Sequence, residues 1–191
     1  MQTGREAIQA LFDGRQADHV PIHDNVWTDA ARKWVGQGMP AREDGSPCDV
    51  LDHLGLDIVT CGGGIDWQPK RGVAEVLDET DEWSVVRNGA GAALKWWKHR
   101  SGTPEHIDFE MTSREVWERD YRPLLVDFDP GRVGDTAAAA AALAHRREQG
   151  KWAAYGSVHV WETMRSSMGD YTMYIALETD PDWIHDFCRV Y

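Results

Sequence analysis

Three short apolar runs, separated from one another by helical patterns, constrain the fold of this chain most strongly. They cover residues 19–24, 56–61 and 151–158. Apolar residues at helical spacing, with capping residues and closing glycines, predict helices over residues 3–13, 28–38, 47–55 and 135–150. Strands that are separated by helices usually pair in parallel, so the sequence predicts an α/β fold with a mainly parallel sheet.

The middle of the chain changes period. Residues 73–99 hold three β-rich runs separated by short turns, which predicts an antiparallel meander inserted into the α/β pattern. A helix is expected over residues 113–125, one or two helices over 160–180, and a last helix from Pro181 with Asp180 as its N-cap. Thr28 and Ser113 are further predicted N-caps. With 191 residues the chain is expected to form one domain, residues 1–191.

Polar side chains lie at or just after the end of each of the three runs. If the runs are parallel strands, their carboxyl ends meet at one rim, which in a parallel α/β barrel is the active-site face. A carboxylate and an imidazole at such a rim can transfer protons or orient a substrate. The predicted catalytic residues are Asp66, His159 and His23. The predicted substrate-binding residues are Asp24, Asn25, Trp27, Trp67, Trp161 and Glu162.

Each of these residues also has a structural interpretation. His23 can cap its own turn, Asp66 can form a turn, and His159 can begin a helix. The glycines at 62–64 match neither a phosphate-binding loop nor a dinucleotide-binding loop, because no Lys–Ser/Thr pair and no helix start follows them. They are interpreted as the sharp end of a strand that leads to Asp66.

Charge and cysteine content exclude several classes of function. The net charge of −12 argues against binding to nucleic acid or to an anionic membrane surface, since both require a basic patch. Three widely spaced cysteines without zinc-site spacing are typical of free thiols in the cytoplasm. No metal site is predicted within the chain, and no apolar run is long enough to span a membrane.

Several segments resemble the uroporphyrinogen decarboxylase superfamily, in particular its uncharacterised bacterial branch. They are REAIQALFDGRQADHVPI, LGLDIVTCGGGIDW, SGTPEHIDF and YGSVHVWETMRSSMGDYTMYIALETDPDWIHDF. Their order along nearly the whole chain carries the resemblance, since no one of these motifs is specific. The resemblance implies a (β/α)8 barrel of which residues 1–191 are the N-terminal half, with the meander as an insertion.

The same resemblance implies two chemistries for the complete protein. One is cofactor-free decarboxylation of a tetrapyrrole, and the other is zinc-dependent methyl transfer from a corrinoid or to a thiol. The decarboxylases carry paired arginines after the first strand, whereas this chain reads HDNVWTDAARKW there, so methyl transfer is at least as well favoured. Zinc would then be held by ligands beyond Tyr191, and a corrinoid protein would be a partner.

Two expectations concern the chain as a piece. The sequence stops inside the predicted last helix, which is interpreted as a truncation, and a half barrel with an unpaired sheet edge is expected to aggregate or to form a homodimer. The alternative function is a non-catalytic fragment or binding module. In that case the Trp-rich meander would serve as an interaction surface, since ten tryptophans are many for 191 residues.

Overall fold

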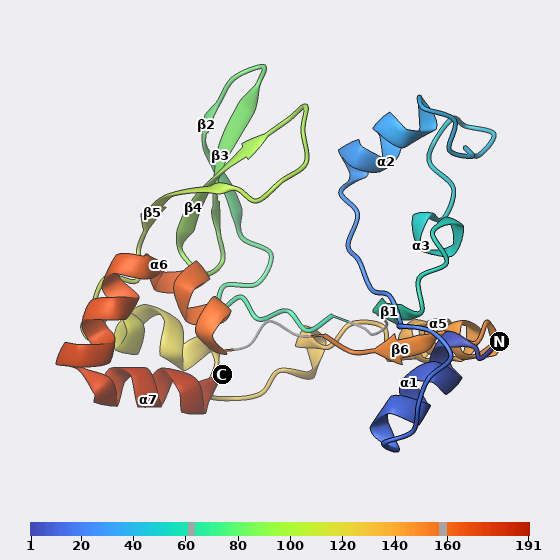
Figure 1. Ribbon diagram of the computed structural model, residues 1–191. Helices are drawn as coiled ribbons and strands as arrows, with labels where there is room; N and C mark the ends of the chain where they lie inside the picture. Colours follow the sequence, from blue (N-terminus) through green and yellow to red (C-terminus); the bar gives the residue numbers. More distant parts are fainter. Residues whose placement is uncertain (61–63, 157–159) are drawn as a thin grey trace. The chain divides into compact units, whose positions relative to one another are not determined.

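Two short strands from distant parts of the sequence pair in parallel. The computed structural model describes residues 1–60, 64–156 and 160–191. Strand β1 (Ile58–Thr60) pairs in parallel with β6 (Trp152–Ala154), with Ile58 opposite Trp152 and Thr60 opposite Ala154 (Figure 1). The predicted strand over residues 19–24 is not formed, although the Ile22 carbonyl oxygen accepts from the amides of Asp57 and Ile58 at 3.0 and 3.3 Å.

The first helix is confirmed with its end signals. Helix α1 (Gly4–Phe12) begins after Thr3, whose hydroxyl accepts from the Glu6 amide while the Glu6 carboxylate accepts from the Thr3 amide. This reciprocal capping box satisfies amides that the first turn would otherwise leave unpaired. Gly14 follows with φ +68°, the left-handed conformation that closes a helix.

Helices α2 (Thr28–Val35), α3 (Val50–His53) and α5 (Thr136–Glu148) lie within the predicted ranges. The prediction of Thr28 as a cap is wrong. The N-cap of α2 is Trp27, which makes no capping side-chain hydrogen bond, and Thr28 is already helical. Asp49 and Asp135 cap α3 and α5 with their carboxylates, as expected for short acidic side chains at helix starts.

The predicted meander is confirmed and is larger than expected. Its strands are β2 (Ala74–Glu79), β3 (Trp83–Asn88), β4 (Ala92–Trp97) and β5 (Glu105–Phe109), paired antiparallel in chain order (Figure 1). His106 lies in β5 opposite Leu94. The fold is therefore mixed α/β, but the larger sheet is antiparallel and the parallel sheet has two strands among the described residues.

Both edge strands of the antiparallel sheet are interrupted. A register shift in β2 leaves Leu77 unpaired, and one in β5 leaves Ile107 unpaired. Bulges and charged side chains hinder pairing of an edge strand with another chain. β2 also carries three acidic side chains, which hinder such pairing by their charge: Glu75, Asp78 and Glu79. These features oppose aggregation through this sheet, while the predicted aggregation or dimerisation of the chain stays a prediction.

The helices of the second half begin as expected and then diverge from the pattern. Ser113 caps α4 (Arg114–Val116), but the predicted helix over 113–125 continues as a π-helical segment, Trp117–Tyr121, and a 3₁₀ turn, Arg122–Leu124. Helix α6 (Val160–Thr179) is interrupted at Gly169, whose φ of +73° and ψ of +163° are not helical. Helix α7 (Pro181–Val190) starts at Pro181 with Asp180 as cap, as predicted.

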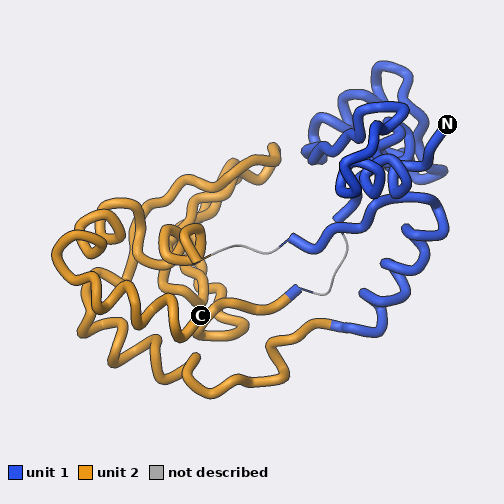
Figure 2. Tube along the Cα trace, turned by 60° about the horizontal axis from the view of Figure 1, so that its bottom comes forward, with its two compact units in different colours: residues 1–64, 135–156 blue, residues 65–134, 157–191 orange. Residues whose placement is uncertain are grey.

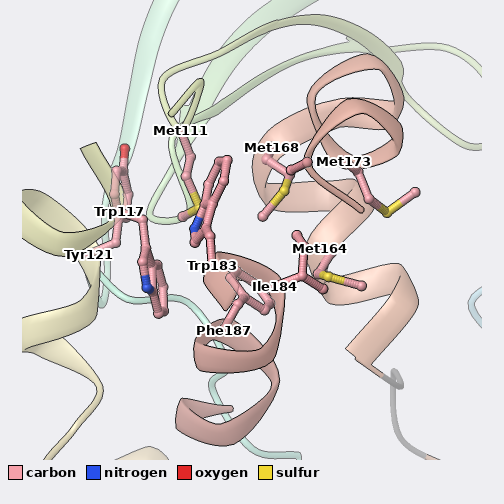
Figure 3. Packing of buried hydrophobic residues seen from close by; sticks show 10 residues of the cluster. Met111, Trp117, Tyr121, Met164, Met168, Met173, Trp183, Ile184 and Phe187 are labelled. Carbon is pink, nitrogen blue, oxygen red and sulfur yellow. The ribbon is translucent and has the colours of Figure 1, made fainter. Parts of the chain in front are cut away.

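The largest hydrophobic core lies between α6, α7 and the π-helical segment. Trp117, Tyr121, Met168, Met173 and Phe187 are among its fully buried side chains (Figure 3). The Trp117 and Phe187 rings approach to 4.9 Å between centroids, and the Trp117 indole N–H donates to Asp186 at 2.9 Å. Methionines from α6 fill the remaining space, the use that suits an unbranched and flexible side chain.

The chain divides into two compact units. Unit 1 comprises residues 1–64 and 135–156, and unit 2 comprises residues 65–134 and 157–191 (Figure 2). Unit 1 therefore contains the parallel strands with α1, α2, α3 and α5, and unit 2 contains the antiparallel sheet with α4, α6 and α7. The candidate site residues are distributed over both units.

The kink in α6 gives a first prediction. A Cβ on Gly169 would lie 2.6 Å from Cε2 of Phe109, and the residue has a positive φ. We expect Gly169→Ala to lower the free energy of unfolding by about 2 kcal/mol, since strain and a clash add up there. Urea unfolding measures this. Gly156→Ala is the control, because its Cβ meets nothing within 4 Å, and its change should stay within about 0.5 kcal/mol. An equal loss of unfolding free energy in the two variants would contradict the strain and the clash assigned to position 169.

Candidate functional site

The first group of predicted site residues lies in unit 1, in the segment that connects Ile22 to α2. The side chains of His23, Asp24 and Asn25 are exposed, and Trp27 is 56% exposed. The His23 Nδ1 lies 3.3 Å from the Ile58 carbonyl oxygen, which places His23 beside β1. The Asp24 carboxylate accepts from the Asn25 amide at 2.7 Å. The group is thus open to solvent and available to a ligand.

A histidine that precedes this segment, His19, holds it in place. The His19 Nδ1 lies 2.6 Å from Asp18 Oδ1 and its Nε2 lies 3.3 Å from Asp57 Oδ1. The other oxygen of Asp57 accepts from the Ile22 amide at 3.0 Å, so one carboxylate joins the start of β1 to the segment. The bond to Asp18, and then that to Asp57, raises the pKa of His19, while the bond to His19 lowers the pKa of Asp18.

This triad makes the stability of unit 1 depend on pH. Because the folded-state pKa of His19 is raised above its ordinary 6.5, its contribution is present below that value and is lost as pH rises through the raised pKa. The contribution of Asp18, with its lowered pKa, is present above its ordinary 3.8 and is lost as pH falls through the lowered value. We therefore expect the melting temperature to fall between pH 6 and pH 9, and His19→Gln to reduce that fall. Thermal melts across this range check it; an unchanged pH profile in His19→Gln would contradict the role of the triad.

Asp66 lies in unit 2, in the loop that leads from β1 towards the antiparallel sheet. Its Oδ1 accepts from the Gln68 amide at 3.0 Å, and its Oδ2 lies 3.5 Å from Nε of Arg71. Arg71 also donates to Asp129 at 2.6 Å and to the Gly131 carbonyl at 2.6 Å. Asp66 therefore forms a turn, which was the structural alternative predicted for it. A ligand that binds the Asp66 carboxylate would share this carboxylate with Arg71.

The buried guanidinium of Arg132 fixes the main chain of this loop. Its NH1 donates to the carbonyls of Asp66 at 3.1 Å and Gln68 at 2.7 Å, and its NH2 donates to Pro69 at 3.1 Å and Leu124 at 3.0 Å. In return the Asp66 amide donates to the Arg132 carbonyl at 2.9 Å. These hydrogen bonds fix the main chain at Asp66 and so position its side chain, as a binding group requires.

Removal of this guanidinium should destabilise unit 2. Arg132→Met leaves main-chain carbonyls buried without donors, so we expect the free energy of unfolding to fall by about 3 kcal/mol and the Asp66 amide to exchange its proton faster. Arg119→Met is the matched control, because Arg119 is exposed and pairs with its neighbour Asp120. Urea unfolding and hydrogen exchange report both effects, and equal stability of the two variants would be the contradicting outcome.

A cluster of charged groups next to this loop was missed from the sequence. Glu110 accepts from the Tyr121 hydroxyl at 2.6 Å and lies 3.3 Å from the Lys70 ammonium and 3.2 Å from Arg87. These contacts, that of Tyr121 first, lower the pKa of Glu110, while burial raises the pKa of Tyr121. A Cβ at Gly91 would lie 2.2 Å from the Tyr121 oxygen, which explains a glycine in the turn between β3 and β4. In the sequence, Gly91 is the one feature that could have indicated this cluster.

Two further predicted residues, Trp161 and Glu162, belong to the first turn of α6. Trp161 is 44% exposed, and its ring lies 5.8 Å from that of Tyr174. Glu162 accepts from Arg165 at 2.7 Å, and this hydrogen bond lowers the pKa of Glu162. A carboxylate with a lowered pKa is a poor proton donor at neutral pH, so Glu162 suits binding better than acid catalysis. His159 lies outside the described residues.

The predicted site residues thus fall into two groups, one in each unit. Trp67 is half-buried next to Asp66 in unit 2. Their convergence on one rim stays a prediction. Within residues 1–60, 64–156 and 160–191, no three His, Cys, Asp or Glu side chains are placed to hold a metal ion together. No helix in that part of the chain has the length and apolar character to cross a membrane.

Comparisons with protein-family models, with curated proteins and with solved structures gave no match.

Proposed function

We propose that the chain is the N-terminal half of a uroporphyrinogen decarboxylase-like barrel, whose rim binds a tetrapyrrole or a corrinoid-linked methyl group. The observation that carries the proposal is that the Ile22 segment, β1 and β6, which follow one another in the chain, are hydrogen-bonded neighbours. The Asp57 carbonyl accepts from the Trp152 amide of β6 at 2.8 Å, while the amides of Asp57 and Ile58 donate to the Ile22 carbonyl at 3.0 and 3.3 Å. The start of β1 is therefore hydrogen-bonded both to the Ile22 segment and to β6. Consecutive strands of a (β/α)8 barrel are neighbours in this way.

The register of the parallel pair supports a common rim. Thr60 is opposite Ala154, so the carboxyl ends of β1 and β6 lie at the same end of the strand pair. Asp66 and Trp67 follow the first strand, and Trp161 and Glu162 follow the second. In the proposed enzyme, Asp66 and His23 bind polar groups of the substrate, and His159 adds an imidazole for proton transfer. The exposed tryptophans provide apolar contact for a macrocycle.

The alternative function is a non-catalytic binding module. One observation favours it: the antiparallel sheet carries its tryptophans near the surface. The Lys95 ammonium lies 4.5 Å from the centroid of Trp83 and 4.9 Å from that of Trp97, and Trp96 is 44% exposed. Indoles near the surface of this sheet, together with the exposed side chains of Val76, Leu77 and Ile107, offer apolar contact to a ligand.

The proposed enzyme is tested by binding and turnover with Asp66→Asn. Asparagine keeps an oxygen for the Gln68 amide but loses the negative charge, so folding should be preserved while binding weakens by about tenfold or more. The intact protein that carries this chain is titrated with uroporphyrinogen and with methylcobalamin, and tryptophan fluorescence reports binding. Release of carbon dioxide or demethylation of the corrinoid then distinguishes the two chemistries.

Asp78→Asn, an exposed carboxylate of β2, is the matched control and should bind like the unmodified protein. The proposal fails if neither compound binds, or if Asp66→Asn and Asp78→Asn bind equally well.

A further inference from the structure

A small pocket lies at the turn between β4 and β5, in unit 2 and apart from the predicted rim residues. Its volume is about 280 Å³. This is close to the lower end of the range found for small-molecule sites. The lining residues are Trp96, Trp97, Arg100, Ser101, Gly102, Thr103, Pro104 and Glu105. Two indoles therefore share the pocket with a guanidinium, hydroxyls and a carboxylate.

The two indoles have different surroundings. The Trp97 Nε1 donates to Glu105 Oε1 at 3.2 Å, and the Lys95 and Arg100 side chains lie over its ring, 4.9 and 4.4 Å from the centroid. Trp97 is thus held by the protein itself. The neighbouring Trp96 is 44% exposed, and no other ring or cation of the described chain lies over it. Trp96 presents an apolar aromatic face that a ligand can cover.

The charges of the pocket favour an uncharged ligand. Its lining contains one cation, Arg100, and one anion, Glu105, and neither forms an ion pair with a described residue. For a singly charged ligand, attraction by one of these two groups is offset by repulsion from the other, so a net charge on the ligand gains little here. A ligand that offers both donors and acceptors can use the guanidinium, the carboxylate and the Thr103 hydroxyl together.

We propose that this pocket binds a neutral pyranose sugar. The C–H face of a pyranose ring is apolar and flat enough to cover the indole of Trp96, and its equatorial hydroxyls can accept from Arg100 and donate to Glu105. The ordered Trp97 and Glu105 reduce the entropy lost on binding. This site uses other residues than the proposed barrel rim, so either can fail without the other.

The test is a titration of the protein with methyl β-D-glucoside, methyl α-D-mannoside, methyl β-D-galactoside and N-acetylglucosamine. The indole N–H signal of Trp97 in nitrogen-15 NMR spectra reports binding. At least one of these sugars should shift that signal saturably. Glucosamine as a cation, glucuronate as an anion and mannitol as an acyclic polyol should bind at least about tenfold more weakly.

Trp96→Ala and Arg100→Gln should each weaken binding about tenfold, the loss of one aromatic or charge-assisted contact. Both side chains are exposed, so the variants should melt like the unmodified protein. Trp34→Phe is the control, since Trp34 lies in α2 and outside the pocket, and it should bind normally. No saturable shift with any of the four sugars, tighter binding of a charged probe, or unchanged affinity in both pocket variants would overturn the proposal.

Discussion

The guanidinium of Arg132 is the contact on which the candidate site in unit 2 depends. Three glycines precede this loop and a proline lies within it, so the loop has few amides to bond its own carbonyls, which need donors from elsewhere. Arg132 supplies them from a buried position, with NH1 and NH2 shared among four carbonyls. The planar fork of arginine suits this task, since lysine could not reach carbonyls in fixed directions. The direction of Asp66 follows from a residue more than sixty positions away in the chain.

Features that do not depend on distant partners could be predicted from the sequence. Helices α1, α5 and α7 were predictable because their caps and apolar positions are local, as Thr3 with Glu6 and Asp180 before Pro181 show. The antiparallel strands β2 to β4 were predictable from β-branched and aromatic runs between turns. These features need no knowledge of the rest of the chain.

The errors have a common physical origin in tertiary contacts. Residues 19–24 have a strand-like composition, but Pro21 has no amide to donate and the Asp57 carboxylate takes the Ile22 amide that a ladder would use. The helix expected over 113–125 widens into a π-helical segment, in which Trp117 and Tyr121 are both buried. The roles of His19, Glu110 and Arg132 could not be predicted, because each depends on partners far away in sequence. Asp66 was identified as a candidate from its position after a strand, and its partner Arg71 was not.

The pairing of charges bears on the choice between the two proposed chemistries. A tetrapyrrole with several carboxylates needs unpaired cations near its binding residues. The cations around Asp66 are Arg71, which is already paired with Asp66 and Asp129, and Arg132, which is already bonded to main-chain carbonyls. The cation beside Glu162 is Arg165, which is already paired with Glu162. A carboxylate-rich substrate would have to displace these pairs against a net charge of −12. A corrinoid-linked methyl group does not need such cations at its reacting carbon, and its macrocycle can be contacted by Trp67 and Trp161. Among the two chemistries, the distribution of charge therefore favours methyl transfer.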